Sequence, residues 1–139
     1  MLDVLEHIPD AANALGKARD LLNPSGRMLL TVPAFNLLWT KHDDFNHHIT
    51  RYTKRLMRQQ TSQAGFDIEN QHYLFHWTFP AKLLVRLKEK ISPAAPKPAS
   101  LPGKMSNAIL KTLCRFEQAT LTQLRLPFGS SLVVSLRKK

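Results

Sequence analysis

The sequence has little cysteine and no long apolar run, and each shortage excludes a class of protein. Cys114 is the single cysteine among 139 residues, which excludes an intrachain disulfide and a cysteine-rich metal site. A lone thiol is typical of a reducing compartment, so we expect a cytoplasmic protein. No stretch approaches the roughly 18 uninterrupted apolar residues that a membrane-spanning helix needs.

Negative charge is scarce in the second part of the chain. Residues 1–50 hold four Lys/Arg against six Asp/Glu, and residues 51–139 hold sixteen against four, giving net charges of −2 and +12. Such a basic region attracts phosphate-bearing substrates, anionic membranes or nucleic acids, or simply forms a solvated face. Aromatic and basic residues are not interleaved on one strand, so we expect no nucleic-acid partner.

The order of apolar patterns predicts an α/β fold. A buried strand ends near Val4, and Asp10 is a suitable N-cap for a helix that runs through about Leu22. Pro24 and Gly26 end that helix. The apolar run at 28–32 then predicts a strand that is buried on both faces of a parallel sheet. The first 33 residues therefore predict a βαβ unit.

The rest of the chain predicts further helices and strands after a long connection without regular structure at residues 34–52. Thr53 and Gly65 are suitable caps for the first of these helices. A proline-rich segment at 92–104 separates the second helix from the third. In chain order, the helix, strand, two helices and final strand are expected at 53–65, 66–74, 80–91, 105–125 and 131–136.

Four short motifs carry a resemblance to one family. They are residues 3–8 (Asp-Val-Leu-Glu-His-Ile), 22–27 (Leu-Asn-Pro-Ser-Gly-Arg), 64–66 (Ala-Gly-Phe) and 126–131 (Leu-Pro-Phe-Gly-Ser-Ser). In this order they resemble the second half of a class I S-adenosylmethionine-dependent methyltransferase, most closely the type 11/12 members. The resemblance implies a Rossmann-like sheet, present as strands four to seven with flanking helices. It also implies that the last strand lies antiparallel beside the fifth.

The family's glycine-rich cofactor loop and acidic ribose ligand are not found here. The five glycines are isolated, and no Gly-x-Gly pattern occurs. We therefore expect residues 1–139 to be the C-terminal part of one methyltransferase domain, in which residues 76–125 are a variable helical insertion. Such a fragment is expected to be inactive by itself. The alternative is a methyltransferase-like partner protein that binds without catalysing.

The resemblance implies methyl transfer from S-adenosylmethionine. Because ligands in open α/β sheets bind at the carboxyl ends of strands, Leu2, Asp3 and Val4 are expected beside the cofactor. Glu6 and His7 then face the acceptor, Glu6 as a substrate contact and His7 as a candidate catalytic residue. Each also has a purely structural interpretation. Glu6 can be a capping carboxylate, and His7 can be a hydrogen-bonded loop histidine.

A second constellation follows the predicted strand at 28–32. It resembles a loop that covers the active site in a subgroup of the family. His42 or His47 is the expected general base, since an imidazole exchanges protons near neutral pH. Arg51 is suited to a phosphate or carboxylate. The expected substrate contacts in this loop are Trp39, Asp43, His48, Arg51 and Tyr52.

Two other interpretations of this loop stay open. Asp43, His48, Arg51 and Tyr52 can instead hydrogen-bond to one another and order the loop. Histidines and carboxylates at 42–48 are also ligand types for a divalent metal. We expect no metal, because a loop without a helix does not fix the ligand spacing.

The expected acceptor is a small or lipid-linked molecule. Leu84, Leu87 and the basic residues of the helix at 80–91 are suited to core packing, to a cap over the acceptor pocket or to a dimer contact. They are equally suited to peripheral contact with a membrane. The sequence does not predict an oligomeric state.

Overall fold

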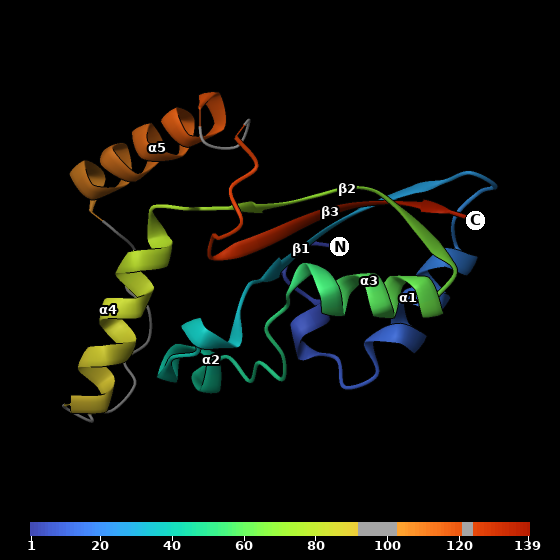
Figure 1. Cartoon of the computed structure of the whole chain (residues 1–139), viewed down its shortest axis with the longest axis horizontal. Coiled ribbons are helices and arrows are strands. Elements are labelled where there is room, and N and C mark those ends of the chain that lie inside the picture. The colour runs from blue at the N-terminus through green and yellow to red at the C-terminus, as the bar shows by residue number, and fades with distance from the viewer. Residues whose placement is uncertain (92–102, 121–123) are drawn as a thin grey trace.

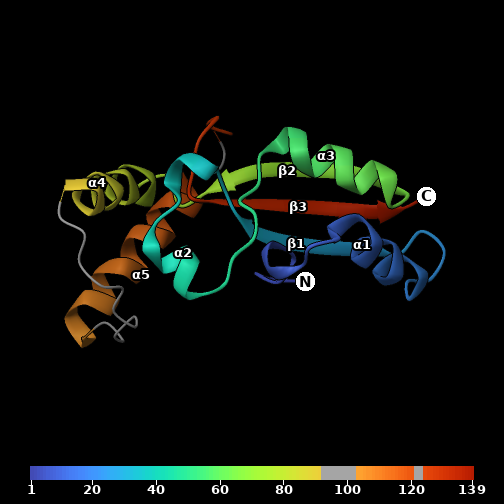
Figure 2. The same cartoon turned by 90° about the horizontal axis from the view of Figure 1, so that it is seen from below.

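An antiparallel sheet of three strands, in the order β1–β3–β2, is the centre of the computed structural model, which describes residues 1–91, 103–120 and 124–139. The strands are β1 (Arg27–Pro33), β2 (Phe66–Leu74) and β3 (Ser131–Lys138). β3 is antiparallel to both neighbours and lies between them (Figure 2). The expectation that the last strand lies antiparallel beside the strand at 28–32 is therefore confirmed.

The first residues of the chain lie along the other edge of β1. Leu2 forms a parallel bridge with Thr31, and the Asp3 N–H donates to the Thr31 carbonyl at 2.9 Å. The predicted parallel strand is thus present only as this bridge. The expectation that it is buried is wrong, because the Leu2 and Val4 side chains are both exposed.

Two helices, α1 (Ala11–Asp20) and α3 (Lys54–Gln63), cover one face of the sheet (Figure 1). Both predicted N-caps are confirmed, since Asp10 accepts from the Asn13 N–H at 3.0 Å and Thr53 accepts from the Leu56 N–H at 3.2 Å. Helices and sheet enclose a core of fully buried side chains, among them Leu5, Leu15, Leu30, Val32, Tyr52, Met57, Leu132, Val134 and Leu136.

No helix of the described residues lies over the opposite face in the middle of the sheet (Figure 1). Leu29 is 53% exposed there, and Val133 and Ser135 are half-buried. Successive residues of a strand point to opposite faces, so packing against α1 and α3 buries only every second residue. The prediction that the strand at 28–32 is buried on both faces is therefore wrong for β1.

The connection at 34–52 is more regular than predicted. It contains a 3₁₀ turn, η2 (Asn36–Leu38), and a short helix, α2 (Lys41–Phe45). α2 begins with a capping box, in which the Asp43 carboxylate accepts from the Thr40 N–H at 2.9 Å. A Thr followed three residues later by an acidic residue is a sequence pattern of such a box, and the sequence-based prediction of an irregular connection did not take it into account.

Helices α4 (Thr78–Ile91) and α5 (Lys104–Ala119) lie beyond the end of the sheet at which β3 begins (Figure 1). α5 ends six residues earlier than predicted, and most of the predicted proline-rich segment, residues 92–102, lies outside the described residues. The expectation that the apolar side chains of this helix pack in the core is wrong for α4, which has no buried residue. Within the described ranges, no helix is long and apolar enough to cross a membrane.

Candidate active site

A cavity of about 440 Å³ opens where β1 ends and β3 begins. Pro33 pairs with Ser131 at this point, and a 3₁₀ turn, η1 (Leu5–His7), lies on the adjoining edge with α2 and α4 nearby. The cavity thus lies at the carboxyl end of β1, where ligands bind in α/β folds. Its lining residues are Asp3, Glu6, His7, Pro33, His42, Asp43, Asn46, His48, Arg51, Lys82, Ser130 and Ser131.

Asp43 organises one wall of this cavity. Its fully buried carboxylate accepts from the Arg51 Nε at 2.9 Å and from the Arg51 Nη2 at 3.1 Å. It also accepts from the Thr40 hydroxyl at 3.1 Å and lies 2.8 Å from the His48 Nδ1. Burial by itself would raise the Asp43 pKa, but the Thr40 N–H, Arg51 and His48 outweigh it and lower that pKa.

This network confirms the loop-ordering interpretation for three of its four members. Arg51 is buried, and its Nη1 donates to the Ala34 carbonyl at 3.0 Å, so its guanidinium is engaged within the protein. Tyr52 is not in the network. Its hydroxyl donates to the Leu5 carbonyl at 3.3 Å inside the core, and burial raises the Tyr52 pKa to about 12.

His48 is the best-placed imidazole of the cavity. A carboxylate can only accept, so the Asp43 contact places the proton on the His48 Nδ1 and leaves Nε2 as an acceptor. The His7 ring lies edge-on to the His48 ring, with centroids 4.8 Å apart. The Asp43 contact leaves the Nε2 lone pair of His48 to receive a proton or bind a cation.

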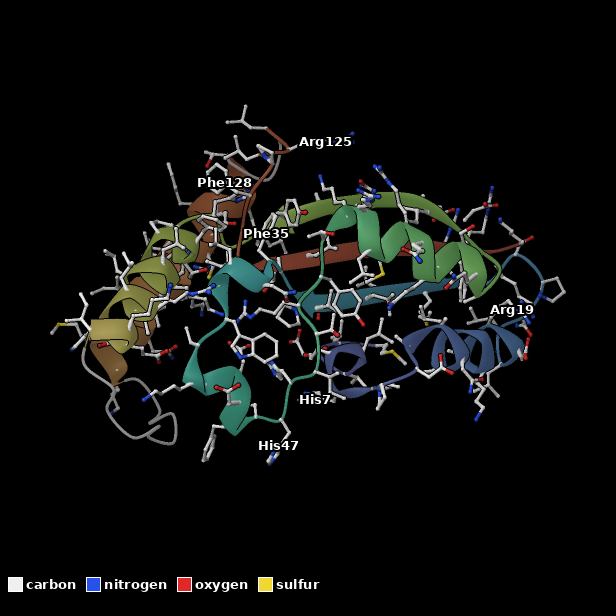
Figure 3. The ribbon with its side chains drawn as sticks, turned by 60° about the horizontal axis from the view of Figure 1, so that its bottom comes forward. His7, Arg19, Phe35, His47, Arg125 and Phe128 are labelled. Atoms are coloured by element: carbon white, nitrogen blue, oxygen red, sulfur yellow. The ribbon has the colours of Figure 1, made fainter. Side chains whose placement is uncertain are left out.

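The other two histidines of the loop are less suited to proton transfer. His42 lines the cavity, but its Nε2 lies 2.8 Å from the Asn46 Nδ2, an amide donor that occupies the lone pair. His47 is exposed and points away from the sheet (Figure 3), and it is not among the lining residues. The structure thus brings His42 to the cavity and leaves His47 outside.

Glu6 is an almost fully buried acid beside His7 and His48. Burial raises the Glu6 pKa, and the nearby Asp3 adds to the rise. Its Oε2 has no hydrogen-bond partner within the described residues. One ligand atom each from Glu6, His7 and His48 lies within 4.8 Å of the others, so these three could hold a metal ion. Of the metal ligands considered at residues 42–48, only His48 belongs to this group.

Lys82 of α4 is a lining residue that the sequence analysis missed. Burial lowers the pKa of its ammonium group, and Arg51 lowers it further. It is one of the basic residues of the helix at 80–91, for which a cap over the acceptor pocket was one of several expected roles. Asn46, Ser130 and Ser131 were also missed, the two serines despite their place in the motif at 126–131.

Four other predicted site residues lie away from the cavity. Leu2 and Val4 are exposed, and Tyr52 is in the core. The Trp39 Nε1 donates to Asp44 at 2.8 Å, in a separate hollow beside α4. Of the three predicted cofactor contacts, only Asp3 reaches the cavity, where its carboxylate accepts from the Thr31 hydroxyl at 3.0 Å.

A family model described as a methyltransferase domain matches residues 1–71, just over half of the 139 residues. The chain belongs to this methyltransferase domain family. The match covers the elements that carry Asp3, Glu6, His7 and the loop at 39–52. A search of curated proteins gives no match.

Solved structures of low sequence identity share the fold. A phosphoethanolamine N-methyltransferase 2 of Haemonchus contortus, in complex with S-adenosyl-L-methionine, matches with a TM-score of 0.51 and 15% identity over 99% of this chain. A complex of the Haloferax volcanii Trm112 methyltransferase activator with a methyltransferase matches with a TM-score of 0.51 and 14% identity over 98% of this chain. A protein described as a methyltransferase from Bacillus halodurans matches with a TM-score of 0.53 and 16% identity over 99% of this chain.

The chain is shorter than these relatives. It spans 32% of the Haemonchus chain, 50% of the Haloferax chain and 67% of the Bacillus chain. The likeness supports a methyltransferase fold of the α/β class.

Proposed function

We propose that this chain acts in methyl transfer from S-adenosylmethionine, with the cavity at the end of β1 as the acceptor site. The observation that carries the proposal is the convergence of two separated sequence segments on one cavity. From the first segment come Asp3, Glu6 and His7, and from the second His42, Asp43, His48 and Arg51. The family match and the S-adenosylmethionine bound to the Haemonchus relative support this cofactor.

The reaction forms a bond between the acceptor's nucleophilic atom and the methyl carbon while the bond from that carbon to sulfur breaks. S-adenosylhomocysteine leaves, and a hydroxyl or amine acceptor loses one proton. We assign that proton to the Nε2 of His48, whose tautomer Asp43 fixes. The cavity otherwise contributes alignment and proximity, which such a transfer mainly requires. Asp3 is assigned to the cofactor side, while backbone contacts from Leu2 and Val4 stay predictions.

Lys82 replaces Arg51 as the proposed contact for an anionic group of the acceptor. Arg51 is already bonded to Asp43 and to the Ala34 carbonyl. Lys82 has no hydrogen bond or ion pair to any described residue. Burial disfavours its charged form, and a nearby anionic group would stabilise that form. We therefore propose a phosphate- or carboxylate-bearing acceptor, small or lipid-linked. The cytoplasmic location stays a prediction.

A transfer assay tests this proposal. The polypeptide, as its gene encodes it, is incubated with methyl-labelled S-adenosylmethionine and a set of amine and hydroxyl acceptors, each with and without a phosphate group. We expect label to enter phosphate-bearing acceptors preferentially, and the Lys82→Ala variant to lose this preference. We also expect a metal chelator to leave the rate unchanged.

Two outcomes would contradict it. Cofactor binding without transfer to any acceptor would indicate a non-catalytic binding protein. A chelator-sensitive rate that zinc or manganese restores would instead assign Glu6, His7 and His48 to a metal ion.

A further inference from the structure

α4 presents an apolar surface that nothing in the described chain covers. Leu84 is 67% exposed and Ile91 is 85% exposed, with Leu87 exposed between them. These residues follow one another at spacings of three and four, so they lie on one face of the helix. Val85 adds a further exposed side chain. An apolar face of this extent is unusual for a helix that lies only in water.

α5 presents a similar stripe. Met105, Ile109 and Leu113 recur every fourth residue and are all exposed, as is Phe116 one turn further. Ile109 and Leu113 line a shallow hollow with Ala108 and Thr112. α5 also contains the half-buried Cys114. Both helices are thus amphipathic with their apolar sides free.

The acidic side chains of the two helices are directed inward. Glu89 is the one acid of α4, and its Oε2 accepts from the Lys41 N–H at 3.1 Å. Glu117 is the one acid of α5, and it is buried. Its carboxylate accepts from the His76 backbone N–H and lies 2.8 Å from the His76 Nδ1. The exposed charges of α4 and α5 are therefore basic, and they comprise Lys88, Lys90, Lys104, Lys111 and Arg115.

We propose that α4 and α5 form a docking surface for an anionic lipid membrane. Exposed leucines, a phenylalanine and lysines on amphipathic helices are the combination that lies in a lipid headgroup region. Basic side chains near such a surface are attracted by anionic lipids, and no exposed carboxylate of these helices opposes them. The exposed basic charges of these helices favour an anionic surface as the occupant over a second, equally basic copy.

The docking surface is connected to the candidate active site. α4 places Lys82 in the cavity, and the Arg86 Nη1 donates to the Asn36 carbonyl at 2.9 Å and to the Leu37 carbonyl in η2. α4 therefore joins the membrane-facing residues to the loop that lines the cavity. The inference that the docked protein methylates a lipid-linked acceptor rests on the proposed methyl transfer. The inference that it binds a membrane does not.

Vesicle sedimentation tests the surface. We expect the wild-type polypeptide to bind vesicles that contain phosphatidylglycerol, to bind phosphatidylcholine vesicles weakly, and to be released by high salt. The variant Lys88→Glu/Lys90→Glu should bind about tenfold more weakly or worse, because two attractions become repulsions. The variant Leu84→Gln/Leu87→Gln should bind weakly to both kinds of vesicle.

A matched control is Leu21→Gln, since Leu21 is 88% exposed at the end of α1 and lies outside the docking surface. It should bind like the wild type, and circular dichroism should show all variants folded. Equal binding by the α4 variants and the control would overturn the inference. So would a stable dimer in size-exclusion chromatography that Leu84→Gln/Leu87→Gln dissociates, since the stripe would then bind a second copy. Transfer to soluble acceptors is measured separately, so its loss would count against the proposed function alone.

Discussion

Replacing Asp43 by Asn should lower the free energy of unfolding by about 3–5 kcal/mol, the loss typical of breaking one partner of a buried ion pair. The amide keeps the size of the side chain but carries no charge and offers one acceptor oxygen in place of two. Arg51 would then be buried without its counter-ion, since its Nε and Nη2 both donate to Asp43. Urea unfolding of wild type and variant measures the difference.

Asp44→Asn is the matched control. Asp44 is the next residue, is exposed, and accepts only the Trp39 Nε1 at 2.8 Å among the contacts of its side chain that are described. An Asn oxygen can still accept that bond, so the unfolding free energy should change by about 0.5 kcal/mol or less. Equal destabilisation by Asp43→Asn and Asp44→Asn would contradict the assignment of Asp43 as the organising residue.

The same network predicts a loss of stability in acid. Because the Asp43 pKa is lowered in the folded state, the unfolded chain takes up this proton at a higher pH than the folded chain does. The contribution of Asp43 is therefore complete above the ordinary carboxyl pKa of 3.8 and is lost as the pH falls towards the folded value. The Asp43→Asn variant should lack this part of the acid transition.

Replacing His48 by Asn should lower the methyl-transfer rate by about 10²–10⁴-fold, the usual contribution of a general base. An Asn amide can still donate to Asp43, as the His48 Nδ1 does, but it provides no basic nitrogen towards the cavity. Binding of S-adenosylhomocysteine should be unchanged, because His48 lies on the acceptor side. Single-turnover transfer with methyl-labelled cofactor measures the rate.

His47→Asn separates this effect from a general disturbance of the loop. His47 is the adjacent residue and is exposed outside the cavity, so its replacement should leave the rate within about twofold. A large loss for His47→Asn, or an unchanged rate for His48→Asn, would contradict the assignment of the base. The first result would instead support the sequence-based expectation that His47 is catalytic.

Local signals made much of the fold predictable. The capping residues Asp10 and Thr53 have short polar side chains at the start of apolar helical patterns, and both caps are formed. The turn at Gly65, which has a φ of +78°, likewise follows from a residue type that adopts this conformation readily. The antiparallel pairing of β3 with β1 was expected from the family resemblance, because no local pattern specifies a long-range pairing.

Burial was predicted less well, because it depends on which elements cover which face. Leu29 and Leu30 are equally apolar, yet only Leu30 faces the helices. The stripes of α4 and α5 have the spacing of core helices, and periodicity alone does not reveal that no described element packs against them. These stripes are instead the basis of the proposed docking surface.

The candidate site was predicted in its residues more than in its roles. The sequence drew attention to Asp43 and Arg51 as substrate contacts, whereas the structure pairs them with each other. His48 was placed among the substrate contacts, and its orientation by Asp43 makes it the better base. Lys82 reaches the cavity from a distant helix, and no spacing rule connects position 82 with positions 3–7.

Calorimetric titration of S-adenosylhomocysteine into the polypeptide, as its gene encodes it, tests the central claim most directly. We expect saturable binding that Asp3→Ala weakens and that Asp20→Ala, at the far end of α1, leaves unchanged. Such a result would place the cofactor beside the cavity that holds His48. Absence of binding, or binding that is indifferent to Asp3, would contradict the claim that this cavity is the site of methyl transfer.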